Sequence, residues 1–294
     1  MSYFENCSLC PRYCRVNRYI TIGECGVDAH IRYANALLYK GEEPPISGKR
    51  GTGAVFFSGC PLHCVYCQNF AFSQMAHGKT IDLAQLIDIY LALQRKGAWT
   101  LELVTATQYA PYIVASVEQA RNEGLILPVV WNTSGYETAE TLDMLKATVD
   151  IYLTDLISLD EDFCEHYIGA KHYPEIAKKA IKHMYEQKGN LQIDGEGRAK
   201  KGLIVRMLVL PENVNHIEKS LRFLSEEVSR FLSISVMDQY TPVYKAGEFP
   251  ELSRKITVGE YGRALATVEE FGFENGWRQT HRLSEMPATK KVIQ

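Results

Sequence analysis

The chain has 294 residues, of which 46% are hydrophobic and 23% are charged, and its formal net charge is -3. This composition is typical of a globular protein and allows one large domain or two ordinary ones. No apolar run approaches the roughly 20 residues of a membrane-spanning helix, and residues 1–6 lack the basic and apolar regions of a signal peptide. We therefore expect a cytoplasmic protein without a membrane partner. The near-neutral charge also argues against a nucleic-acid partner.

The eight cysteines fall into groups. Four lie within residues 7–25, three lie within residues 60–67, and Cys164 stands alone. In a chain without a secretory signal, such groups indicate metal binding or catalysis rather than disulfide bonds.

Residues 1–50 are interpreted as a cysteine-rich extension in which Cys7, Cys10, Cys14 and Cys25 supply four thiolates. Turn-forming residues stand beside these cysteines, as a tight metal-binding loop requires. The irregular spacing leaves open whether the metal is an iron–sulfur cluster or a structural zinc ion. We favour iron–sulfur because a second cysteine group follows. Three arginines, Arg12, Arg15 and Arg18, form either a solvated basic face, which is the simpler interpretation, or a set of charges that offsets a cluster.

Residues 54–57 are a short apolar run that ends at Ser58-Gly59 and predicts a buried strand. Cys60, Cys64 and Cys67 then lie in the loop at its C-terminal end. Three thiolates leave one iron of a four-iron cluster without a protein ligand, so that iron is open to a substrate or cofactor. A zinc knuckle is the alternative and needs a fourth ligand, but His63 lies between two of the cysteines and is badly placed to supply it.

The rest of the chain alternates between short apolar strands and amphipathic helices. Strands are predicted at residues 101–104, 127–131, 149–153, 203–210 and 234–237, helices at 80–96, 111–121, 138–147, 160–167, 174–187, 214–231 and 257–271, and an exposed loop at 192–201. Alternation of this kind implies a parallel sheet with helical crossovers. We predict an α/β fold, a partial (β/α)6 barrel of parallel strands over residues 51–280, with the N-terminal cysteine-rich extension and a C-terminal tail at 281–294. A doubly wound sheet is the alternative, and in both folds function collects at the C-terminal ends of the strands.

Polar residues follow several of the predicted strands. They are Thr105, Ala106 and Thr107 after the second strand, Asn132 and Ser134 after the third, Asp155 after the fourth and Tyr240 after the sixth. For each of them taken alone, loop capping is an equally good explanation. Arg206 differs because a charge inside an apolar strand is costly unless it is paired, and Asp155 is a candidate partner.

The C-x3-C-x2-C spacing, with Tyr66 directly before the third cysteine, resembles the radical S-adenosylmethionine (SAM) superfamily. Further stretches resemble its pyruvate formate-lyase activating enzyme group, in the branch with the N-terminal motif C-x-x-C-P-R-x-C-x-V-N-R. They are residues 7–18, 173–177, 206–211 and 239–242. The resemblance implies a radical SAM oxidoreductase. In that family a reduced [4Fe-4S] cluster cleaves SAM to methionine and a 5′-deoxyadenosyl radical, which abstracts hydrogen from a substrate.

The resemblance also implies roles for residues of this chain. Cys60, Cys64 and Cys67 would ligate the catalytic cluster, and the remaining predicted SAM-binding residues are Tyr66, Thr105, Ala106, Thr107, Asn132, Ser134, Asp155, Arg206 and Tyr240. Asn132 and Ser134 would face the ribose or carboxylate of SAM, the two tyrosines would lie near the adenine, and Arg206 would meet the carboxylate. Residues 105–107 stand where relatives often have Gly-Gly-Glu, and residues 155–157 read Asp-Leu-Ile where relatives tend to have Asp-x-Lys.

The substrate is less well defined than the cofactor chemistry. The resemblance implies a glycyl radical enzyme as a candidate protein substrate and a flavodoxin or ferredoxin-type protein as electron donor. The alternatives are a radical SAM enzyme that acts on a small molecule or peptide, and a non-catalytic iron–sulfur or zinc binding module. No cysteine follows Cys164, so the C-terminal cysteine groups of many peptide-modifying radical enzymes are absent.

Overall fold

The computed structural model describes residues 3–279 and 290–292. The strands are β1 (Arg32–Tyr39), β2 (Thr52–Phe57), β3 (Lys79–Thr80), β4 (Leu101–Val104), β5 (Val129–Thr133), β6 (Ile151–Asp155), β7 (Gln192–Ile193), β8 (Ala199–Leu208), β9 (Ser233–Met237), β10 (Gly276–Gln279) and β11 (Lys290–Val292). The α-helices are α1 (Pro44–Ser47), α2 (Phe70–Ser73), α3 (Leu83–Arg95), α4 (Ala110–Asn122), α5 (Ala139–Leu145), α6 (Glu161–Ile168), α7 (Tyr173–Lys188), α8 (Ile217–Phe223) and α9 (Val258–Glu270). Within these residues no helix has the length and apolar character needed to cross a membrane.

Seven parallel strands stand side by side in chain order, β2-β4-β5-β6-β8-β9-β10. In a doubly wound sheet the order of the strands reverses part-way across the sheet. The uninterrupted strand order here is therefore that of a barrel. Antiparallel strands extend both edges, β1 and β3 beside β2 and β11 beside β10. In the described part of the chain these two edges do not pair with each other, so the barrel is open.

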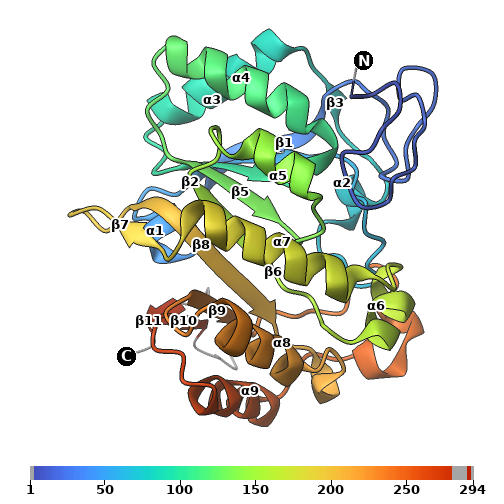
Figure 1. The fold of residues 1–294 in the computed structure, drawn as a ribbon, viewed down its shortest axis with the longest axis vertical. Helices are drawn as coiled ribbons and strands as arrows, with labels where there is room; N and C mark the ends of the chain where they lie inside the picture. The colour runs from blue at the N-terminus through green and yellow to red at the C-terminus, as the bar shows by residue number, and fades with distance from the viewer. Residues whose placement is uncertain (1–2, 280–289, 293–294) are drawn as a thin grey trace.

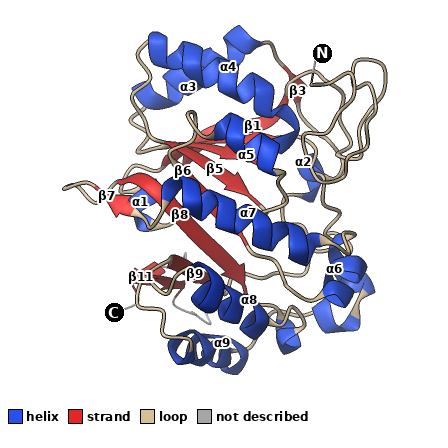
Figure 2. Cartoon of the chain, in the orientation of Figure 1, coloured by secondary structure: helices blue, strands red, loops and turns tan. Residues whose placement is uncertain are grey.

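The helices cover the outer face of this sheet, as Figures 1 and 2 show for α3, α4, α5, α7, α8 and α9. Side chains alternate along each strand, so every second residue faces the helices and packs in the large outer core. The opposite residues face inward and form a smaller inner apolar cluster, which comprises Ile46, Val130, Ile151, Leu153, Ala199, Ile204 and Trp277. This cluster fills the interior of the barrel, so polar residues on the inner face mark a different layer.

Helix starts follow the signals in the sequence. Thr257 caps α9 in a capping box with Glu260, as its sequence pattern predicts, and Asp82 caps α3 in the same way with Gln85. These caps satisfy backbone N–H groups that the first helical turn leaves without partners.

The structure corrects the predicted elements in several places. Residues 192–201 are largely exposed, as expected, but they form a hairpin rather than a loop, because β7 pairs there with the first residues of β8. The helix predicted at 214–231 is much shorter, since α8 ends at Phe223 and a π-helical turn, η3 (Leu224–Val228), follows. Residues 44–47 form the short helix α1, and the strands β1, β3, β10 and β11 were missed. Most of the predicted C-terminal tail, residues 281–289 and 293–294, lies outside the described residues.

Candidate active site

The loop after β2 brings three thiols together. Cys67 N–H donates to the carbonyl of Cys64 at 3.2 Å, which folds the loop back on itself. Burial, with a smaller contribution from the nearby Cys67, raises the pKa of Cys60 to about 12. Burial also raises the pKa of Cys64 well above its ordinary value, with additional contributions from Cys67 and Cys60. The three sulfurs are therefore electrostatic neighbours, and all three are free thiols.

His63 does not complete this group. Its Nδ1 lies 3.3 Å from Oε1 of Gln74, and its side chain is exposed. Among the residues that the structure describes, no three Cys, His, Asp or Glu side chains are placed so that they could hold a single metal ion. Three convergent thiols without a fourth ligand suit a cubane with one open iron better than a zinc knuckle.

The N-terminal cysteines form a second group. Cys7, Cys10 and Cys25 are buried and Cys14 is half-buried. A Cβ placed on Gly23 would lie 3.4 Å from Sγ of Cys25 and 3.6 Å from Sγ of Cys14, so both sulfurs line the small space that this glycine leaves open. Burial, with smaller contributions from the nearby Cys25 and Cys7, raises the pKa of Cys10 to about 12. Cys14 and Cys25 thus share one space, and Cys7, Cys10 and Cys25 are electrostatic neighbours, but no three of these thiols are placed to hold a single metal ion. The group is therefore a candidate for a larger iron–sulfur cluster rather than for a zinc ion.

The two cysteine groups lie against each other. Cys60 N–H donates to the carbonyl of Cys25 at 3.0 Å. Arg12 donates from Nε to the carbonyl of Pro61 at 2.6 Å and from Nη2 to the carbonyl of Gly169 at 2.8 Å. Figure 1 shows the N-terminal loops (dark blue) on the side toward which the arrows of β5 and β8 point. The N-terminal segment therefore packs against one side of the cysteine loop.

Gly59 allows this close approach. Its φ is +84°, and a Cβ there would lie 2.6 Å from the carbonyl oxygen of Cys25. We expect Gly59→Ala to destabilise the protein by about 1–3 kcal/mol more than Gly26→Ala. Gly26 is the matched control because it also has a positive φ, +78°, but no atom within 4 Å of its Cβ position. Chemical denaturation at equal metal loading measures the free energy of unfolding of both variants. Equal decreases would show that the contact with Cys25 does not affect stability.

The loops after the other strands converge on the cysteine loop. Gln108 donates from Nε2 to the carbonyls of Ser58 and Gly59, at 2.9 and 3.0 Å, and to that of Thr105 at 2.8 Å. From the loop after β9, the carbonyl of Gln239 accepts a 3.1 Å hydrogen bond from Gln68. These contacts fix the loops after β2, β4 and β9 relative to one another.

A polar layer, formed by Glu42, Glu102, Asn132, Asp155 and Arg206, lies on the inner face of the sheet. Strand pairing places Asp155 directly opposite Arg206. Arg206 donates from Nε to Oδ1 of Asp155 at 2.6 Å, from Nη2 to Oδ2 of Asp155 at 3.2 Å and to Oδ1 of Asn132 at 2.9 Å, and from Nη1 to Oε2 of Glu42 at 2.7 Å. This is the paired environment that a charge in an apolar strand requires.

Glu102 is the buried acid of the polar layer. Its Oε1 accepts a 2.6 Å hydrogen bond from Nδ2 of Asn132, while its Oε2 has no hydrogen-bond partner. Burial and the nearby Glu42 raise the pKa of Glu102 well above its ordinary value, against the opposing effects of Asn132 and Arg206. The layer thus contains three carboxyl groups and one guanidinium, and Glu102 is the group most easily kept neutral.

The other predicted SAM-binding residues are placed differently. Tyr66 and Tyr240 are buried with ring centroids 6.0 Å apart in an edge-to-face contact, and the hydroxyl of Tyr240 donates to the carbonyl of Leu252. Thr105 has a positive φ, +58°, and Ala106 is buried beside it. The carbonyl of Ser134 accepts a 2.7 Å hydrogen bond from the hydroxyl of Tyr173.

Thr107 contributes to a buried carboxylate site instead. Its hydroxyl donates to Oε1 of Glu137 at 2.8 Å, and the same oxygen accepts from Nε1 of Trp131 and from the hydroxyl of Thr133. Trp131 and Thr133 alternate with the inward-facing Asn132. Thr107 therefore holds Glu137 rather than pointing its hydroxyl into the polar layer.

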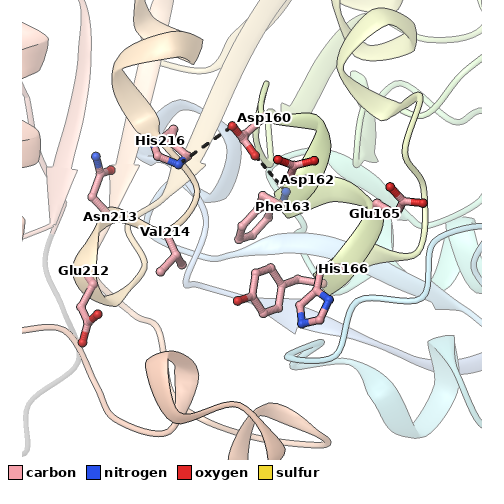
Figure 3. A pocket seen from close by; sticks show the side chains of 10 residues that line it. Asp160, Asp162, Phe163, Glu165, His166, Glu212, Asn213, Val214 and His216 are labelled. Carbon is pink, nitrogen blue, oxygen red and sulfur yellow. Dashed lines mark hydrogen bonds and ion pairs between the residues drawn. The ribbon is translucent and has the colours of Figure 1, made fainter.

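A separate open cavity of about 660 Å³ lies beside α6 and the turn η2 (Pro211–Asn213). Figure 3 shows Asp160 between His216 and Phe163, with Glu165 and His166 farther along α6. None of the predicted cluster- or SAM-binding residues lines it, so it is distinct from the predicted site.

The sequence pattern of the radical SAM superfamily matches residues 54–224, from the first parallel strand to the end of α8. The match covers more than half of the chain. The chain belongs to the radical SAM superfamily. Membership implies an enzyme that uses a [4Fe-4S] cluster and SAM, and the three free thiols after β2 fit that cluster.

Further comparisons found three similar proteins. The uncharacterized protein MJ0674 of Methanocaldococcus jannaschii is 29% identical over 282 residues, which are 92% of this chain and 76% of that protein. A domain of pyruvate-formate lyase-activating enzyme from Bacteroides vulgatus superposes with a TM-score of 0.42 at 14% identity over 58% of this chain and 91% of that one. SuiB of Streptococcus suis, solved with SAM, gives 0.47 at 14% identity over 72% and 42%.

Proposed function

We propose that this protein is a radical SAM enzyme whose catalytic cluster is held by Cys60, Cys64 and Cys67. The observation that supports the proposal is that three free thiols follow β2 in one loop as electrostatic neighbours, and that His63, between two of them, is turned to Gln74 instead. When bound, a reduced cluster supplies the electron that cleaves SAM to methionine and a 5′-deoxyadenosyl radical, which abstracts hydrogen from the substrate. The protein supplies orientation and a closed site.

The residues around the cysteine loop would bind different parts of SAM. The buried rings of Tyr66 and Tyr240 provide an apolar surface for the adenine. Thr105 and Ala106 offer backbone groups to the amino group of SAM in place of the missing Gly-Gly-Glu. Asn132, Ser134 and Asp155 stand at neighbouring strand ends and would face the ribose and carboxylate. Arg206 already makes four hydrogen bonds, so we assign it to positioning Asn132 and Asp155 before any direct contact with SAM.

The test is an assay for 5′-deoxyadenosine. Protein reconstituted with iron and sulfide without oxygen, then reduced with dithionite, should convert SAM to this product. Protein with a full complement of iron that forms none would instead support a non-catalytic binding module.

We propose a second iron–sulfur cluster at Cys7, Cys10, Cys14 and Cys25, with a flavodoxin or ferredoxin-type protein as electron donor. The space beside Gly23, which the sulfurs of Cys14 and Cys25 line, supports a metal there. The hydrogen bond from Cys60 N–H to the carbonyl of Cys25 would place this centre beside the catalytic loop. The substrate class is proposed as a glycine in a glycyl radical enzyme, following the activating-enzyme resemblance.

Reconstitution should bring the chain close to two four-iron clusters. The measurement is iron, sulfide and zinc per chain by elemental and colorimetric analysis. One equivalent of zinc with about four irons would show that the N-terminal cysteines hold a structural zinc ion and not a second cluster. Cys10→Ala should lower the metal content while SAM cleavage is partly retained, because the catalytic ligands are untouched.

A further inference from the structure

Arg18 is a fully buried cation in the N-terminal segment, with 0% of its surface exposed. The simpler interpretation of the sequence, a solvated basic face, is wrong for this residue, although Arg15 is exposed as that interpretation expects. Among the residues that the structure describes, Arg18 forms no salt bridge with a carboxylate. Its Nε has no hydrogen-bond partner.

The groups in contact with Arg18 are backbone carbonyls, aromatic rings and sulfur. Its Nη1 donates to the carbonyl of Gln108 at 2.6 Å and lies 3.8 Å from Sγ of Cys7, and its Nη2 donates to the carbonyl of Asp28. Its guanidinium carbon stands over the rings of Phe4 and Tyr109, 5.1 and 5.7 Å from their centroids. Carbonyls and ring faces stabilise a guanidinium only partly.

A buried charge without a counter-charge destabilises a fold by several kcal/mol. An arginine cannot become neutral to avoid this, because its pKa is too high. The sulfurs are the remaining source of negative charge. Four thiolates outweigh the positive charge of either a zinc ion or an oxidised four-iron cluster, so both centres would be net anionic.

We propose that Arg18 is the buried counter-ion of a net anionic metal–thiolate centre at Cys7, Cys10, Cys14 and Cys25. The inference rests on the proposed second metal site and assigns its charge and its main electrostatic partner. The charge argument is the same for zinc and for an iron–sulfur cluster. In the metal-free chain, Arg18 would then have no counter-charge.

The test compares Arg18→Met with Arg18→Lys, in a full-length chain whose Cys60, Cys64 and Cys67 are replaced by alanine. In this background the only proposed centre is the N-terminal one, so the result does not depend on SAM cleavage. The measurement is the metal retained per chain under increasing chelator concentration. Arg95→Met, on the exposed end of α3, is the control for a charge lost elsewhere.

Arg18→Met should release metal about tenfold more readily than the parent, whereas Arg18→Lys should recover most of the affinity because it keeps the charge. The metal-free Arg18→Met chain should melt no lower than the metal-free parent, since the substitution removes an unpaired buried charge. Unchanged metal retention in Arg18→Met would overturn the proposal. Equal loss in both variants, or an Arg18→Met chain that does not fold even without metal, would assign Arg18 to packing instead.

Discussion

Replacing Cys60, Cys64 or Cys67 by alanine should abolish the formation of 5′-deoxyadenosine from SAM, and the loss should be near total for each. The three thiols lie in one loop between β2 and α2, and His63, the nearest alternative ligand, is exposed and contacts Gln74. The triple variant should be no worse than any single one, because ligands of one cluster act as a unit.

Cys164→Ala is the matched control for this series. Cys164 is also a free, buried cysteine, but it lies in α6 and its thiol donates to the carbonyl of Ser158. It should keep cleavage close to the parent level after the same reconstitution. Substantial activity in any one of the three loop variants would exclude that cysteine as a cluster ligand.

Arg206→Ala should lower the free energy of unfolding by at most about 3–5 kcal/mol, because it leaves two half-buried carboxylates, Asp155 and Glu42, without their counter-charge. Asp155 would lose two hydrogen bonds and Glu42 one, while Glu102 already has an oxygen without a partner. Chemical denaturation measures the loss. The control is Lys179→Ala, which breaks an exposed ion pair with Glu175 in α7 and should cost less than about 1 kcal/mol.

A SAM titration of the same variant separates the two roles considered for Arg206. If the residue positions Asn132 and Asp155, stability and SAM affinity should fall together. A variant with nearly parental stability that no longer binds SAM would instead place Arg206 in direct contact with the carboxylate of SAM.

The sequence predicts the parallel part of the sheet because each buried strand is a short apolar run between turn residues. Six of the seven parallel strands, β2, β4, β5, β6, β8 and β9, correspond to predicted runs. β1 was missed because it is only half covered by the core and carries polar residues such as Asn35. β10 was missed because it is only four residues long and carries Arg278 and Gln279 in place of an apolar run. The winding order of the strands also depends on contacts far apart in the chain.

Some residues of the candidate site could also be predicted from the sequence, and others could not. The cysteines and Arg206 are visible in the sequence because thiol spacing and a charge in an apolar strand are local signals. Glu102 carries the same signal, a charge within Leu-Glu-Leu-Val, but was overlooked. Glu42, Gln108 and the burial of Arg18 have no local signal, since their partners lie 164, 49 and 90 positions away at Arg206, Gly59 and Gln108.

The most direct measurement is electron paramagnetic resonance of the reduced, reconstituted protein with SAM labelled at its amino nitrogen or carboxylate oxygen. If three thiolates leave one iron open to SAM, the labelled nuclei should couple magnetically to the cluster, and the coupling should vanish in Cys60→Ala. A fully loaded, reduced cluster in the parent protein that shows no coupling to labelled SAM would contradict the assignment of an open iron at Cys60, Cys64 and Cys67.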